Sequence, residues 1–253
     1  MIWGISNITE NFFNMVNYLI KSNIYLYYYL SMTQQQKIYS VLCTLFSILI
    51  IIGNLTYQKL ICLPIPFTHT FEISVGALLY PLTFLITDLL AEFYGEVETK
   101  FCVKLAIIMN LIVATILFNM DHFQATAWST LDNATFHRVF SSFSYAFIGS
   151  MIACYVSQNI DVLIYLFFKR LTGSKYLWIR NNISSGLSLL IDTAIVISFL
   201  TYFKVVPQEH FFDLIKFSYS WKLFLTICST PVFYFLNFLI RRASKNYYYN
   251  RSA

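Results

Sequence analysis

The stretch that decides the fold is Pro81–Gly95, which reads PLTFLITDLLAEFYG. It closes an apolar run that begins at Ile73, and it carries two acidic residues, Asp88 and Glu92, four positions apart. That spacing places both carboxylates on one face of a helix. An acidic side chain inside a membrane-spanning helix costs about 2.5–3.5 kcal/mol on insertion scales, so such residues are usually functional and paired with a neighbouring helix. The stretch therefore predicts a functional membrane helix whose partners lie elsewhere in the chain.

The composition is typical of an integral membrane protein. Of the 253 residues, 58% are hydrophobic and only 11% are charged, and the mean hydropathy is +0.62. Soluble domains carry roughly 25% charged residues. The length accommodates about six spans of ~20 residues joined by short loops. We therefore expect an all-α integral membrane protein, a bundle of six transmembrane helices in the lipid bilayer.

Apolar runs place the six spans within residues 38–240, between an N-terminal extension at 1–37 and a basic tail at 241–253. Met32 offers an alternative translation start, which would remove most of the extension. The predicted spans are Ile38–Lys59, Ile73–Tyr94, Phe101–Asn119, Phe143–Phe168, Ile183–Phe203 and Trp221–Ile240.

The distribution of basic residues predicts the orientation, because Lys and Arg are retained on the cytoplasmic side. With the N-terminus inside, twelve of the 17 basic residues fall in inner segments. The five outer ones are Lys59, Arg138, Lys204, Lys216 and Lys222. Both termini are therefore predicted to be cytoplasmic. The net charge of +5 reflects this retention, and no nucleic-acid partner is expected.

The sequence offers little for catalysis or metal binding. It lacks the H-E-x-x-H, G-x-S-x-G and G-x-x-x-x-G-K-[ST] motifs. Its five cysteines are scattered without a C-x-x-C pair, which favours a packing role. Asp88 and Asp192 leave an intramembrane aspartyl enzyme as a distant alternative, although the glycine signatures expected around such aspartates are missing. We expect no cofactor and no enzymatic activity.

Further polar residues lie within or beside the other spans. Gln158 and Asp161 share one face of span four, and Asn54 near the end of span one is either a helix cap or part of a cavity lining. Asp192 lies near the middle of span five, the costliest depth for a charge, without a partner in its own segment. We expect it to be an unpaired substrate or proton site facing spans two and four. Glu92, near a span end, is expected to pair with Lys or Arg.

Four stretches in this order resemble the queuosine-precursor transporters of the vitamin uptake transporter family. They are GNLTYQK (53–59), PLTFLITDLLAEFYG (81–95), SQNIDV (157–162), and LWIRNNISS followed by IDT within 177–193. The resemblance covers residues 38–240, and residues 1–31 have no counterpart in it. One departure is Leu189, where many members carry Gln, so a polar contact from that position is not expected here.

The resemblance implies a six-helix inner-membrane carrier that imports 7-deazaguanine precursors of queuosine. One carboxylate can accept both donors of a guanine-like base, Asn or Gln can pair with its carbonyl side, and Trp178, Phe93 or Tyr94 can stack on it. The candidate substrate and translocation residues are Asn54, Asp88, Glu92, Gln158, Asp161, Trp178, Arg180, Asn181 and Asp192.

The energy source stays open between proton coupling at an intramembrane acid and docking onto an ATP-driven module, as in a substrate-binding subunit of a vitamin importer. The A-x-x-x-A pattern of such subunits is missing from span one, where only Ser40/Thr44 and Cys43/Ser47 have comparable spacing. The sequence leaves open the oligomeric state and which precursor is carried.

Overall fold

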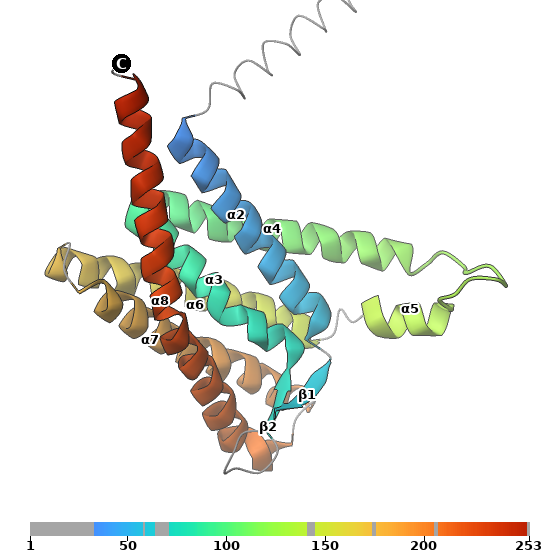
Figure 1. Ribbon diagram of the computed structural model, residues 1–253. Helices are drawn as coiled ribbons and strands as arrows, with labels where there is room; N and C mark the ends of the chain where they lie inside the picture. Colours follow the sequence, from blue (N-terminus) through green and yellow to red (C-terminus); the bar gives the residue numbers. More distant parts are fainter. Residues whose placement is uncertain are drawn as a thin grey trace, which may run out of the picture.

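The computed structural model describes residues 33–57, 59–63, 71–140, 145–173, 176–204 and 207–251. Within this part, six helices are long and apolar enough to cross a membrane (Figure 1). They are α2 (Gln34–Thr56), α3 (Val75–Phe93), α4 (Glu96–Met120), α6 (Tyr145–Thr172), α7 (Leu177–Tyr202) and α8 (Phe211–Arg251). The predicted six-helix fold is confirmed, whereas the possible start at Met32 lies outside the described residues.

Three short elements complete the described chain. A two-stranded antiparallel hairpin, β1 (Leu60–Leu63) and β2 (Phe71–Ser74), joins α2 to α3, with Leu60 opposite Ser74. Helix α5 (Asn133–Phe140) follows α4, and a 3-10 turn (Gln208–His210) precedes α8. The hairpin was not predicted from the sequence, because Ile73 and Ser74 of β2 were assigned to the beginning of span two.

Local interactions define where α2 and α4 begin. Thr33 accepts a hydrogen bond from the Gln36 backbone N–H at 3.3 Å, and the Gln36 side chain accepts one from the Thr33 N–H at 2.9 Å, which together form a capping box. Gly95 separates α3 from α4 with a φ of 86°, a conformation that favours glycine. The chain therefore turns from α3 into α4 across two residues, Tyr94 and Gly95, at the end of the Pro81–Gly95 stretch.

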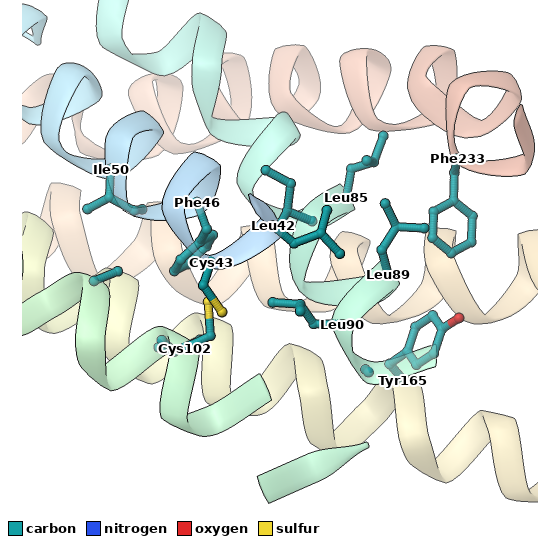
Figure 2. Close-up of a cluster of buried hydrophobic side chains, with 14 of the residues drawn as sticks. Leu42, Cys43, Phe46, Ile50, Leu85, Leu89, Leu90, Cys102, Tyr165 and Phe233 are labelled. Carbon is teal, nitrogen blue, oxygen red and sulfur yellow. The ribbon is translucent and has the colours of Figure 1, made fainter. Parts of the chain in front are cut away.

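Helix α3 is the central helix of the bundle, and it packs against α2, α4, α6, α7 and α8. Figure 2 shows the apolar side of this packing, where side chains of α2, α4, α6 and α8 meet those of α3. The residues labelled there are Leu42, Cys43, Phe46, Ile50, Leu85, Leu89, Leu90, Cys102, Tyr165 and Phe233. The opposite side of α3 is polar and faces α6 and α7.

Contacts between helix ends show how the spans alternate. The Tyr94 hydroxyl donates to the Gln35 carbonyl at 2.7 Å, and the Tyr39 hydroxyl donates to the Glu98 carbonyl at 2.9 Å. These contacts bring the beginning of α2, the end of α3 and the beginning of α4 together. The end of α8 lies at this same end of the bundle (Figure 1), as six crossings require. Which side of the membrane this end faces remains a prediction.

Candidate functional site

A buried polar track runs along the interface of α3, α6 and α7. On α3, Asp88 lies eight residues after Tyr80 and four before Glu92, and on α7 Arg180 and Asp192 are twelve residues apart. The two helices run antiparallel, because Arg180 meets Glu92 whereas Asp192 meets Tyr80. The polar track comprises Tyr80, Thr83, Thr87, Asp88, Glu92, Ser157, Gln158, Asp161, Arg180, Asn181, Ser184, Ser185, Ser188 and Asp192.

The middle of the track holds two adjoining carboxyl groups. Asp88 on α3 and Asp161 on α6 contact each other directly, and both are 0% exposed. The Ser185 hydroxyl donates to Asp88 Oδ2 at 3.4 Å. The hydroxyls of Ser184 and Ser188, one turn apart on α7, lie beside Asp161. We call Asp88 and Asp161 the carboxyl pair.

The carboxyl pair has no cationic partner among the described residues, because neither residue forms an ion pair there. Several buried atoms in and around it also have no hydrogen-bond partner in the described part of the chain. They are Asp88 Oδ1, both carboxyl oxygens of Asp161, Asn181 Nδ2 and Ser188 Oγ. Each such atom costs about 1–3 kcal/mol. Two adjoining buried carboxylates also repel each other, which adds to the cost of this arrangement.

Gln158 is fixed beside the carboxyl pair by threonine hydroxyls of α3. Thr87 Oγ1 donates to Gln158 Oε1 at 2.9 Å, and Gln158 Nε2 donates to Thr83 Oγ1 at 3.1 Å. Gln158 and Asp161 share one helix face, as predicted. This face directs both side chains into the polar track, where both are fully buried.

At one end of the track, the Glu92 carboxylate forms ion pairs with three basic side chains. Its carboxylate lies 3.1 Å from Arg241 of α8, 3.3 Å from Arg180 of α7 and 3.4 Å from Lys169 of α6. The Tyr165 hydroxyl donates to it at 3.1 Å. The expectation that Glu92 pairs with basic residues is confirmed. Arg180 is fully buried and also donates to the Gly173 carbonyl at 2.6 Å.

At the other end, Asp192 is not the unpaired acid that the sequence suggested. Lys222 of α8 lies 2.8 Å from Asp192 Oδ2, and the Tyr80 hydroxyl donates to Oδ1 at 2.6 Å. Ser157 of α6 adds a longer contact of 3.4 Å. Partners from spans two and four are thus present as expected, but the cation from span six was missed. Lys222 is the second residue of the predicted span Trp221–Ile240 but was counted among the outer basic residues; α8 begins at Phe211, ten residues before that span, so Lys222 lies well inside the helix.

Two predicted site residues lie away from the track. Asn54 accepts a hydrogen bond from Ser150 at 2.9 Å and contacts the Met151 sulfur, at the packing of α2 on α6. Trp178 is 52% exposed, and Tyr94 is bound to Gln35. Phe93 lies under the Arg241 guanidinium at 6.0 Å. None of these rings contacts the carboxyl pair in this closed arrangement.

Sequence reasoning missed five residues whose side chains contact Glu92 or Asp192. They are Tyr80, Tyr165, Lys169, Lys222 and Arg241. A usable signal existed for Lys222. A mid-span acid needs a cation from another span, and Lys222 is a lysine followed directly by the long apolar run of span six. Tyr80 stands eight residues before Asp88, on the same helix face. The other three lie within three residues of an end of a predicted span, where basic and aromatic residues are common and carry little information.

Comparisons with known proteins identify a family of transporters. A family model described as "Putative vitamin uptake transporter" matches residues 74–236. A Bacillus subtilis protein named "Probable queuosine precursor transporter" is 26% identical over 64% of this chain and 70% of its own length. A Haemophilus influenzae protein with the same name is 28% identical over 62% of this chain and 65% of its own. No solved structure matches the chain. The chain belongs to the vitamin uptake transporter family, a family of transporters and not of enzymes.

Proposed function

We propose that this chain imports 7-deazaguanine precursors of queuosine across the cell inner membrane, with Asp88 and Asp161 at the centre of the substrate site. One observation carries the proposal: two adjoining, fully buried carboxyl groups have no cation beside them among the described residues. The names of the two relatives supply the substrate class.

The donor and acceptor pattern of a guanine-like base fits these groups. Its ring N–H and neighbouring amine are parallel donors, which one carboxylate accepts together. Its carbonyl oxygen needs a donor, and three are at hand: the protonated member of the carboxyl pair, the Asn181 amide and the Ser188 hydroxyl. The last two have buried atoms without a partner in the described chain. A bound base would therefore satisfy groups that are left unpaired in the empty site.

The site must open for this exchange. Asp88, Asp161, Gln158 and Ser184 are fully buried, so a base reaches them only when α7 moves from α3 and α6. Small side chains on α7 favour such a site, because they leave room once the helices part. They are Ser184, Ser185, Gly186 and Ser188.

Protons are the coupling ion in this proposal. Protonation of one member relieves the repulsion within the carboxyl pair, so the pair can gain or release a proton as the site opens to water on either side. A chain driven by an ATP-hydrolysing module would need no such group, so the carboxyl pair favours a self-sufficient carrier over a substrate-binding subunit.

The test is uptake of a radiolabelled 7-deazaguanine base into proteoliposomes that contain only this chain. We expect uptake that a proton gradient accelerates without ATP and that Asp88→Asn abolishes. Glu98→Gln, an exposed acid at the beginning of α4, is the matched control and should transport normally. Binding without transport would instead favour the ATP-driven subunit. Absence of both binding and transport of every 7-deazaguanine base tested would overturn the proposed substrate.

A further inference from the structure

Two ion-pair clusters bracket the carboxyl pair along the helix axis. On α3, Tyr80 and Glu92 are twelve residues apart, about 18 Å at a rise of 1.5 Å per residue, and Asp88 lies between them. We call the contacts of Glu92 with Lys169, Arg180 and Arg241 the Glu92 lock. The contacts of Asp192 with Lys222 and Tyr80 are the Asp192 lock.

The Glu92 lock ties α3 to three other helices at one end of the bundle. Its cations come from α6, α7 and α8, at 3.4, 3.3 and 3.1 Å from the carboxylate. Lys169 also donates to the backbone carbonyls of Ala91 and Glu92, at 3.2 and 2.5 Å. Since Arg180 holds the carbonyl of Gly173 as well, this lock also fixes the connection between α6 and α7.

The Asp192 lock joins the same four helices on the other side of the carboxyl pair. Lys222 of α8 reaches Asp192 of α7 at 2.8 Å and lies 4.7 Å from the centre of the Tyr80 ring of α3. Ser157 supplies the contact from α6. Asp192 is 1% exposed and Lys222 is 8% exposed, so the lock excludes water from its end of the track.

We propose that these two locks are the two gates of the carrier and that they open alternately. Both are closed in this structure, which explains why the carboxyl pair is enclosed. Ion pairs suit such gates, because water that enters an opening end solvates both separated charges and offsets the lost attraction. The two gates do not depend on which substrate is carried.

Helix α8 is the element that links the gates. It contributes Lys222 to one lock and Arg241 to the other, nineteen residues apart on one continuous helix that packs on both α3 and α7. A tilt of α8 that withdraws Lys222 from Asp192 can leave Arg241 on Glu92, and the reverse tilt does the opposite. Pro231 lies in α8 between the two locks, so the two openings are mutually exclusive when α8 tilts as one body across this proline.

A native thiol allows a direct test. Cys154 of α6 is buried beside Tyr80 in the Asp192 lock, so it reports opening of that gate. In a chain with the other four cysteines replaced by alanine, a membrane-impermeant maleimide is applied to each face in turn. Lys222→Met should raise Cys154 labelling from one face about tenfold, as the open population grows. Glu92→Gln should lower Cys154 labelling below the parent, because it favours opening at the opposite end.

Matched controls and a rescue complete the design. Lys216→Met and Glu98→Gln change exposed residues of α8 and α4 and should label like the parent. The exchanged pair Asp192→Lys with Lys222→Asp should return labelling toward the parent, which distinguishes a lost gate from a misfolded variant. A rise in Cys154 labelling with Glu92→Gln, or unchanged labelling in both lock variants, would overturn the two-gate proposal.

Discussion

Lys222 Nζ lies 2.8 Å from Asp192 Oδ2, and the two side chains are only 10% and 1% exposed. This ion pair changes how a substitution of Asp192 must be understood. Judged from the sequence alone, Asp192→Asn relieves the insertion cost of a mid-span charge and should insert as well as the parent or better. With Lys222 beside it, the same change leaves a buried ammonium without its counter-charge.

Single neutralisations of this pair should therefore destabilise the protein more than the double one. Asp192→Asn or Lys222→Met alone should each lower the free energy of unfolding by as much as about 3–5 kcal/mol, the cost of breaking a buried pair from one side. The double variant removes both charges and should be closer to the parent. Thermal unfolding in detergent measures this. A double variant whose loss equals the sum of the two single losses would show that the residues do not act as a pair.

The six helices could be predicted because hydropathy is summed over some 20 residues and tolerates a few polar positions. The helix faces that carry the polar residues could be predicted as well. Helical spacing alone places Asp88 and Glu92 on one face, and Gln158 and Asp161 on another. Both pairs do point into the same polar track. Information within one segment was therefore sufficient for these features.

The partners could not be predicted, because they depend on how helices pack across the bundle. Asp192 finds its cation 30 residues later in the chain and Glu92 finds Arg241 149 residues later. Lys222 was counted among the outer basic residues because it stands at the beginning of the predicted span, whereas α8 runs from Phe211 to Arg251 and places it inside the helix.

Gly76 should tolerate no side chain, whereas Gly53 should tolerate the methyl group of an alanine. The two residues lie at the crossing of α3 and α2, where a Cβ on Gly76 would collide with the backbone carbonyl of Gly53. A Cβ on Gly53 would lie 3.6 Å from the Gly76 oxygen, an ordinary contact. We expect Gly76→Ala to cost on the order of 1–3 kcal/mol, as overpacking does, and Gly53→Ala to cost little. The expression level and thermal stability of the two variants test this expectation. Equal stability of both variants would contradict this crossing of α3 and α2.

The orientation predicts the location of the α4–α5 segment, which contains the exposed Trp128. If both termini are cytoplasmic, this segment lies outside, because an odd number of spans separates it from the N-terminus. A thiol introduced as Ser129→Cys in a chain lacking the other cysteines should react with an impermeant reagent in intact cells. One placed at Ser252 should react only after permeabilisation. The reverse pattern would show that the chain is inserted the other way round.

The carboxyl pair should dominate substrate binding, and Glu92 should not. An amide at position 88 or 161 presents one acceptor oxygen and a misplaced donor, so Asp88→Asn or Asp161→Asn loses a charged hydrogen bond worth about 1.5–3 kcal/mol. That corresponds to roughly a 10- to 150-fold weaker binding of a 7-deazaguanine base. Glu92 is fully occupied by its cations, so Glu92→Gln should reduce transport while binding changes less.

Equilibrium binding of the base to purified protein distinguishes the variants of the carboxyl pair from Glu92→Gln. Glu98→Gln is the control, and thermal stability is measured on the same samples. The closed carboxyl pair also predicts a difference in stability. Replacing one buried acid by an amide removes the repulsion between adjoining carboxyls, so Asp161→Asn should be at least as stable as the parent even though it binds poorly. A variant that binds normally would remove the carboxyl pair from the substrate site. A variant that loses stability and binding together would instead identify the pair as part of the packing of α3 on α6.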